Sequence, residues 1–174
     1  MQKTLTLIEN LMLKINFKKF FLYSVIVILI FILDRFSKVY ILNLAETNNL
    51  VDIYVTPFFN LYLIWNKGIA FGLFSFEQNS VYNFITILII IINLVILIMI
   101  IKSNDIKTYF LMLILGGSLG NLFDRIYYYA VPDFIDFHIN DFHWFIFNVA
   151  DVFISVGVIC LIIVEFIFNK TSKK

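Results

Sequence analysis

Long apolar runs separated by short polar stretches dominate the pattern of hydrophobic and polar positions along this chain. A helix needs about 20 apolar residues to cross a hydrocarbon core of about 30 Å. Four runs meet or approach that length: residues 20–44, 78–101, 109–123 and 152–168. We therefore expect four membrane-spanning helices, of which the third is short.

Charged residues in these runs are few, and most of them lie near one end of a predicted helix. The second run carries no charge, and the fourth carries only Glu165 near its end. In the first run the charges come late, within "DRFSK" (34–38), and the third run continues into "LGGSLGNLFDR" (115–125). A membrane helix gains nothing from such residues through lipid contact alone, so they require another explanation.

Two outer segments, residues 45–80 and 124–150, connect the helices and differ from ordinary polar loops. Both contain partly alternating stretches rich in aromatic and β-branched residues, "VDIYVTPFFNLYLIW" (51–65) and "DFIDFHINDFHWFIF" (133–147). Alternation of this kind predicts strands, and Pro57 restricts its part of the first stretch to an edge or a bend. We expect a small β-rich cap with an aromatic rim at the membrane interface.

Composition supports an integral membrane protein. Hydrophobic residues make up 61% of the 174 positions and charged residues only 14%, against about 25% in a soluble domain. The mean hydropathy is +0.94. The net charge of +1 and the lack of a basic block give no indication of nucleic-acid binding. The predicted fold class is a mainly α membrane protein with four transmembrane helices and a small β-rich cap on the outer face.

The lysines predict the orientation in the membrane. Four lie within residues 1–19, two at 102–107 and three at 170–174, which is nine of the 13 basic residues. The positive-inside rule makes that side cytoplasmic. We expect a cytoplasmic segment at 1–19, which is not a cleavable signal peptide and could lie flat as an amphipathic helix. The membrane domain then covers 20–168, and 169–174 form a cytoplasmic tail.

Three of the predicted helices bring carboxylates to one depth. Asp34 lies about 21 Å along the first helix from Phe20. Asp124 closes the third helix at its outer end, and Asp151 opens the fourth from the same side. An ionisable side chain at mid-membrane costs about 2.5–3.5 kcal/mol, so a group of them predicts a functional site. The alternative is a set of interfacial caps and ion pairs.

Each polar residue also has a structural interpretation. Asp34 and Lys38 share a helix face and could neutralise each other. Asp124 and Arg125 are adjacent, need separate partners and could form a buried ion-pair network. Asp151 could be a helix N-cap. Further structural roles are a turn at Asp133, close helix approach at Gly116, Gly117 and Gly120, and a hydrogen bond across helices from Asn121.

The stretch "DFHINDFH" holds four possible metal ligands, Asp136, His138, Asp141 and His143. No H-E-x-x-H or C-x-x-C pattern accompanies them. A wet polar loop is the favoured interpretation, and no metal site is expected.

The surplus of carboxylates suggests acid–base chemistry. Two carboxyl groups held together do not both ionise easily and share a proton. One can then activate a water as a base while the other acts as an acid, which hydrolyses an amide without a metal. The spacing alone does not indicate which aspartates form the pair.

Five motifs, in order along the chain, resemble those of the lipoprotein signal peptidases, or signal peptidase II, a family of membrane aspartic endopeptidases. "DRFSK" (34–38) resembles D-Q-x-[ST]-K, and "WNKGIAFG" (65–72) resembles N-x-G-x-A-[FW]. "GGSLGNLFDR" (116–125) resembles G-x-x-G-N-x-x-D-R. "VPDFIDF" (131–137) resembles V-V-D-[FY], and "FNVAD" (147–151) resembles F-N-x-A-D.

The resemblance implies a catalytic pair, Asp133 and Asp151. It also implies supporting or substrate-binding roles for Asp34, Lys38, Asn66, Gly117, Gly120, Asn121, Asp124, Arg125, Asn148 and Ala150. This chain departs from the family pattern at Arg35, Ile69 and Pro132. Pro132 lacks a backbone donor next to Asp133, which questions the local strand pairing more than the chemistry.

The family's substrate is a prolipoprotein whose lipobox cysteine carries a diacylglyceryl group, and cleavage occurs N-terminal to that cysteine. The resemblance implies no cofactor and no metal, a functional monomer, a bacterial cytoplasmic (inner) membrane location and an active site near the outer face. The competing functions are a small transporter or channel, a structural membrane protein with an interfacial ion-pair network, and a metal-dependent membrane hydrolase.

Overall fold

The computed structural model describes residues 17–48, 50–68, 79–140 and 142–171. Four helices are present in this part of the chain: α2 (Phe17–Asn48), α3 (Asn79–Lys102), α4 (Lys107–Tyr127) and α5 (Val149–Thr171). Each helix contains one of the four predicted apolar runs. The one exception is residue 78, the first of the second run, which precedes α3. The predicted amphipathic N-terminal segment falls almost wholly outside the described residues, as does Ile69.

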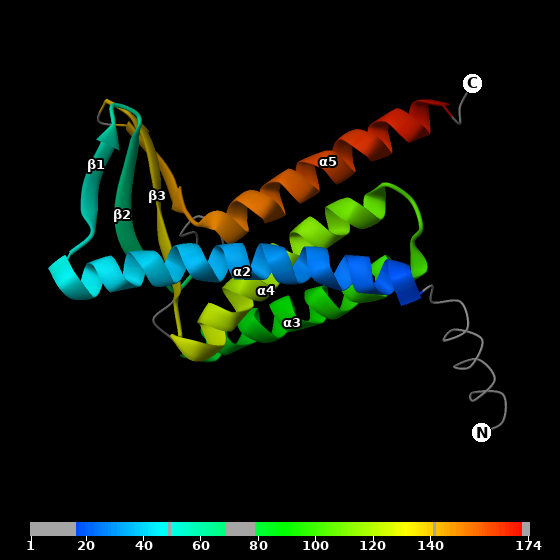
Figure 1. Ribbon diagram of the computed structural model, residues 1–174, viewed down its shortest axis with the longest axis horizontal. Helices are drawn as coiled ribbons and strands as arrows, with labels where there is room; N and C mark the ends of the chain where they lie inside the picture. The colour runs from blue at the N-terminus through cyan, green and yellow to red at the C-terminus, as the bar shows by residue number, and fades with distance from the viewer. Residues whose placement is uncertain (1–16, 49, 69–78, 141, 172–174) are drawn as a thin grey trace.

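The helices lie side by side, with the sheet at one end of the group (Figure 1). The beginning of α2 and the end of α5 lie at the opposite end, together with the connection from α3 to α4. Helix α4 is central, because it contacts α2, α3 and α5. The polar residues late in α4 therefore face protein rather than lipid.

In the described part of the chain, three helices are long and apolar enough to cross a membrane, over Lys19–Asn48, Ser80–Lys102 and Val149–Ile167. Helix α4, the predicted third span, is not among them. It continues as a helix through the whole of the motif at 115–125 and ends at Tyr127. The apolar run stops at Phe123 and Asp124 was expected to close the helix, so the observed helix continues a few residues further, because Asp124 and Arg125 are buried against neighbouring elements.

The predicted cap is a four-stranded antiparallel sheet in the order β1-β2-β3-β4. Its strands are β1 (Asp52–Thr56), β2 (Phe59–Asn66), β3 (Val131–Ile139) and β4 (Phe142–Phe147). Pro57 lies in the turn between β1 and β2, as the bend prediction required. The stretch predicted as a polar loop, with His138 and His143, forms the β3–β4 hairpin instead.

Asp133 lies within a strand, so its predicted structural alternative as a turn residue is wrong. It is opposite Ile64, and Pro132 is opposite Trp65. Partners of β3 on the β4 side begin only at Ile135. The strand pairing tolerates Pro132 because this part of β3 has a neighbour on one side only.

Two apolar clusters hold these layers together. Ile41 of α2 packs with Val51 and with Phe134 of β3, which fixes the sheet to the helices. A second cluster joins α3 and α4 through Ile96, Ile100, Leu111, Met112 and Leu115. Large aromatic side chains are exposed on the strands and their turn, as the predicted rim requires: Tyr54, Phe58, Trp65, Phe142 and Trp144.

Candidate active site

Asp133 is held on both carboxylate oxygens by side-chain amides. Asn66 of β2 donates to Oδ2 at 2.9 Å, and Asn148 donates to Oδ1 at 2.6 Å. The antiparallel pairing of β2 with β3 brings Asn66 close to Asp133 although 67 positions separate them in sequence. Asp133 is fully buried, so without these donors its charged form would be strongly disfavoured.

Asp151 lies in the first turn of α5, and Asn148 is the residue before that helix. The backbone N–H of Asp151 donates to Asn148 Oδ1 at 3.1 Å, and the backbone N–H of Asn148 donates to Asp151 Oδ2 at 3.2 Å. This is a reciprocal capping box with an aspartate at the fourth position. The cap is therefore Asn148, and the predicted alternative of Asp151 as the N-cap is wrong.

Asn148 connects the two aspartates. Its Nδ2 donates to Asp133 while its Oδ1 accepts from the Asp151 backbone. Asp133 and Asp151 also line the same cavity of about 200 Å³, together with Asn66, Asn121 and Arg125. Burial, followed by the nearby charge of Asp151, raises the pKa of Asp133 from 3.8 to about 7, against the opposing effect of its two amide donors.

Lys38 is the centre of a buried ion cluster beside this cavity. Its Nζ donates to Asp34 at 2.9 Å, to Asn121 at 2.7 Å and to Asp124 at 2.7 Å. All three ammonium hydrogens are thus used, which a fully buried lysine requires. Asp34 and Lys38 do pair along one helix face, and Asp124 is a second partner from α4.

Asn121 links this cluster to the aspartate pair. Its Oδ1 accepts from Lys38, and its Nδ2 donates to Asp151 Oδ1 at 2.8 Å. Asp34 makes a second connection, because its Oδ1 accepts from the backbone N–H of Ala150 at 3.0 Å. Helices α2, α4 and α5 are therefore joined through one continuous set of polar contacts.

Arg125 points away from the Lys38 cluster, as its position next to Asp124 predicts. Its Nη2 donates to the carbonyl of Gly68, and its guanidinium lies 5.4 Å from the ring centre of Tyr82. The Tyr82 hydroxyl donates to the Arg125 carbonyl at 2.9 Å. Among the described residues Nη1 has no hydrogen-bond partner, although Arg125 is 4% exposed and lines the small cavity.

The glycines of α4 allow neighbouring helices to come this close. A Cβ on Gly117 would lie 2.5 Å from the carbonyl oxygen of Ala150, and one on Gly116 would lie 2.8 Å from the Ile30 side chain. A Cβ on Gly120 would overlap the Asp34 carboxylate. Close packing therefore accounts for all three, and at Gly120 it directly positions a buried acid.

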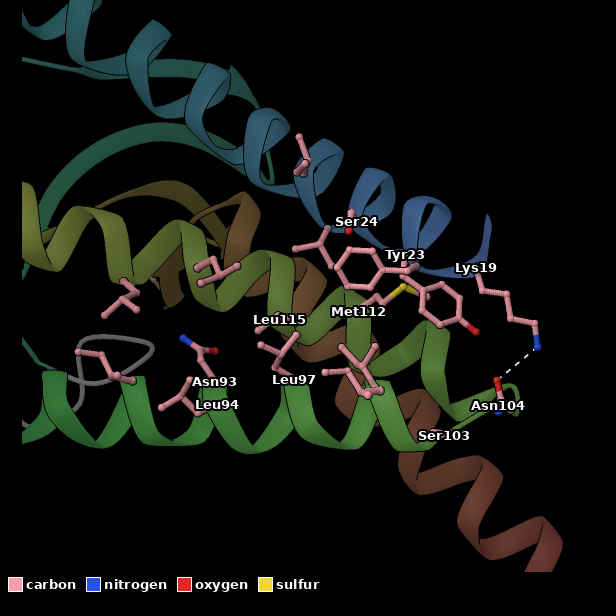
Figure 2. A pocket seen from close by; sticks show the side chains of 18 residues that line it. Lys19, Tyr23, Ser24, Asn93, Leu94, Leu97, Ser103, Asn104, Met112 and Leu115 are labelled. Carbon is pink, nitrogen blue, oxygen red and sulfur yellow. Dashed lines mark hydrogen bonds between the residues drawn. The ribbon is translucent and has the colours of Figure 1, made fainter. Parts of the chain in front are cut away.

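A second, larger cavity of about 530 Å³ lies between α2, α3 and α4 (Figure 2). Apolar side chains such as Leu97, Met112 and Leu115 line it, and the contact between Lys19 and Asn104 lies at one end. None of the predicted site residues lines this cavity. The predicted catalytic aspartates line the smaller cavity instead.

The arrangement resembles an acid–base site rather than a conduction path. Among the described residues, the buried charged side chains come from the second half of α2, the end of α4, β3 and the start of α5. The other ends of these helices contribute none to that set. A channel or ion transporter needs polar groups along its whole depth.

Comparison with known proteins agrees with this chemistry. A family model described as signal peptidase (SPase) II matches residues 26–167. The chain belongs to the signal peptidase II family. The lipoprotein signal peptidase of Pelagibacter ubique is 59% identical over 163 residues, covering 92% of this chain and 98% of the relative. That of Aquifex aeolicus is 38% identical over 159 residues, covering 90% and 92%.

Solved structures support the same assignment. A bacterial membrane enzyme solved at 2.3 Å matches with a TM-score of 0.73 and 32% identity, covering 87% of this chain and 91% of that one. Another, solved at 1.9 Å, matches with a TM-score of 0.67. As a member of the signal peptidase II family, the chain is a protease, and the transporter and structural alternatives are not favoured.

The residues implied by the family motifs come together in this signal peptidase II fold. The site residues that the five motifs imply contact one another or line the small cavity. Sequence reasoning missed several neighbours. Arg35 pairs with Asp124 at 2.5 Å and with Asp34 at 3.2 Å. Tyr82 packs on Arg125, and Ser118 and Ser155 line the cavity. Only Arg35, a second cation within the same apolar run, gave a signal in the sequence.

Proposed function

We propose that this chain removes the signal peptide from diacylglyceryl-modified prolipoproteins, cutting on the N-terminal side of the lipidated cysteine, with Asp133 and Asp151 as the catalytic residues. The substrate class follows from the name shared by its relatives, lipoprotein signal peptidase. The observation that carries the proposal is the placement of two buried aspartates on one small cavity, joined by Asn148.

The pair works with one proton. A pKa of about 7 for Asp133 means that near neutral pH this carboxyl is protonated in a large share of the molecules. The proton belongs to the pair rather than to one oxygen, because the two groups titrate together. A carboxylate and a carboxylic acid are then available at the same time, which amide hydrolysis requires.

The reaction needs no further group. The carboxylate accepts a proton from a water, whose oxygen attacks the scissile carbonyl carbon. The carboxylic acid donates its proton to the carbonyl oxygen as the tetrahedral intermediate forms. Collapse of the intermediate breaks the C–N bond. The leaving nitrogen takes the proton that came from water, and a hydroxyl of the intermediate returns its proton to the carboxylate that donated in the first step, which restores the starting pair. The Arg125 Nη1, which has no partner among the described residues, is available to bind a carbonyl oxygen of the substrate.

The surrounding residues support the pair without reacting. Asn66 and Asn148 orient Asp133, while Asn121 orients Asp151. Lys38 supplies a positive charge that moderates the cost of gathering several acids in one buried place. We assign Asp34, Asp124, Gly117, Gly120 and Ala150 to the close packing of α2, α4 and α5 that keeps these groups in position.

We also propose that α4 crosses the membrane. It runs alongside the three apolar helices and returns the chain from the end far from the sheet to the sheet itself. Four crossings place both termini on the cytoplasmic side of a bacterial inner membrane, as the lysines predict. The sheet and the aspartate pair then lie at the outer face, and a monomer holds the complete site.

A gel-shift assay with a diacylglyceryl-modified precursor tests the catalytic pair. We expect Asp133→Asn and Asp151→Asn to accumulate in the membrane and to lose processing by at least about a thousandfold, since each removes one half of the acid–base pair. Asp52→Asn is the matched control, because Asp52 is an exposed acid on the same sheet. Processing by either dyad variant at a rate near that of Asp52→Asn would refute the assignment.

A further inference from the structure

A cluster of three possible metal ligands lies on the β3–β4 hairpin, apart from the aspartate pair. His138 and His143 are direct partners across the two strands, and their rings stack with centroids 5.1 Å apart. Asp136 lies two residues before His138 on β3, so its side chain is on the same face as the histidines. Asp133 is three residues before Asp136 and faces the opposite side of the strand.

The ligand atoms are already close together. The Nδ1 of His143 lies 2.8 Å from Asp136 Oδ2, and the Nδ1 of His138 lies 3.8 Å from the same oxygen. One ligand atom from each of the three residues lies within 4.8 Å of the others. Two ligands of a tetrahedral zinc ion are about 3.3–3.5 Å apart, given metal–ligand distances of about 2.0–2.2 Å. Side-chain shifts of up to about 1.5 Å would therefore satisfy the geometry.

The cluster has a buried polar atom with nothing to bind. The side chain of His138 is 10% exposed, and among the described residues its Nδ1 has no hydrogen-bond partner. The carboxylate of Asp136 is 3% exposed and lies beside both imidazoles. Buried polar groups are nearly always satisfied, so an unused nitrogen aimed at a buried carboxylate suggests a missing ligand.

We propose that Asp136, His138 and His143 bind one Zn²⁺ ion, with water in the fourth position. Two imidazole nitrogens and one carboxylate oxygen favour zinc, whereas calcium and magnesium prefer oxygen ligands alone. The side chain of His143 is 54% exposed, which leaves a path for the ion and a place for the water. This proposal departs from the expectation of no metal, because the ligands meet across a hairpin and match no zinc motif within one segment.

The zinc ion has a structural role and takes no part in peptide hydrolysis. Strand β4 is an edge strand, and its partner β3 carries Asp133. The ion joins His143 of β4 to Asp136 and His138 of β3, close to the hairpin turn. It therefore stiffens the outer end of the strand whose other end positions the catalytic carboxyl.

The experiment uses the full chain in detergent micelles with no affinity tag of histidines. The sequence has only two histidines, so an imidazole-bound cobalt signal can come only from His138 and His143. After treatment with a chelator and its removal, the protein is titrated with Co²⁺ by visible absorbance and with Zn²⁺ by calorimetry. We expect one ion per chain, displacement of Co²⁺ by Zn²⁺, and a rise in Tm on adding Zn²⁺.

The variants separate a metal site from a structural hydrogen bond. His138→Gln loses a ligand but no hydrogen bond made through Nδ1, so without zinc its Tm should match that of the wild-type protein. Its zinc affinity should fall by at least about a hundredfold, and so should that of His143→Gln. Asp52→Asn, an exposed acid on β1, should bind zinc like the wild-type protein.

Three results would overturn the zinc site: no Co²⁺ absorbance in the wild-type protein, a stoichiometry far from one, or equal affinity in wild type and His138→Gln. Peptidase activity is measured in parallel with chelator present. Retained activity there agrees with a structural zinc ion. Loss of activity at a temperature where the zinc-free protein stays folded, restored by zinc alone, would overturn that role. Failure of the catalytic-pair assignment is read from the Asp133 and Asp151 variants and leaves this test unaffected.

Discussion

The side-chain amide of Asn148 lies 2.6 Å from the Asp133 carboxylate, although the two residues belong to different elements. Asn148 also caps α5 through its contact with the Asp151 backbone. One side chain thus fixes the start of a membrane helix and the position of a strand carboxylate. Helix capping and orientation of the proposed catalytic pair depend on the same residue.

Asn148→Ala should therefore reduce both stability and turnover. Loss of the cap costs about 1 kcal/mol, and loss of the bond to Asp133 removes a buried donor from an acid. We expect a lower Tm in micelles and at least a tenfold lower kcat per folded enzyme. Asn148→Ser keeps a capping oxygen but loses the amide that reaches Asp133, so it should retain more stability than Asn148→Ala while still losing activity. Equal activity in all three proteins would contradict the linking role.

The pH profile of processing should have an alkaline limb set by Asp133. Its pKa of about 7 implies that the required proton is lost above neutral pH, so kcat/KM should fall toward tenfold per pH unit beyond about pH 7. The hydrogen bond from Asn66 lowers this pKa by stabilising the ionised form. Asn66→Ala should move the limb to higher pH, and a move to lower pH would contradict the assignment.

Stability should also depend on pH through Asp133. The folded-state pKa of about 7 exceeds the ordinary value of 3.8, so the folded protein binds the proton more tightly than the unfolded chain. This contribution to stability is complete below about pH 4 and is lost as the pH rises through 7, by at most about 4 kcal/mol. Asp133→Asn cannot ionise and so does not lose this stability at high pH. Its Tm should exceed the wild-type Tm at pH 8, and the two Tm values should be closer at pH 5. Thermal unfolding in micelles at both pH values checks the difference.

Lys38→Met should strongly reduce the amount of folded protein. It leaves Asp34 and Asp124 buried with only Arg35 as a charged partner among the described residues, and breaking a buried ion pair from one side costs about 3–5 kcal/mol. Lys107→Met is the matched control, because Lys107 forms an exposed pair with Glu165 and should change little. Membrane abundance and Tm of the two variants give the comparison, and similar losses would show that burial of the ion cluster is unimportant.

Gly120→Ala and Gly116→Ala should differ in their effect on catalysis. Both add a methyl group where α4 touches α2, so both should lower stability, by about 1–3 kcal/mol. At Gly116 the new group meets Ile30, whereas at Gly120 it meets the Asp34 carboxylate that accepts from the Ala150 N–H. We expect turnover per folded enzyme to fall several-fold for Gly120→Ala and to remain near wild type for Gly116→Ala.

Hydropathy was a reliable guide to the helices and a poor guide to where α4 ends. The other three helices are long and apolar over most of their length, so their sequence records their position directly. Helix α4 is central, and its glycines, Asp124 and Arg125 face other helices. The residues of such a helix are chosen by contacts with neighbouring helices, and a count of apolar residues does not measure those contacts.

The sequence by itself determined the four helices, the strand-forming character of the two outer segments and the residue types available for acid–base chemistry, because these follow from local periodicity and composition. Only the tertiary structure decided that Asn148 joins Asp133 to Asp151, that Lys38 is shared between α2 and α4, and that Asp136 meets two histidines across a hairpin. These contacts join residues from separate elements. Their distances depend on how helices and strands pack, and spacing along the chain contains no measure of that packing.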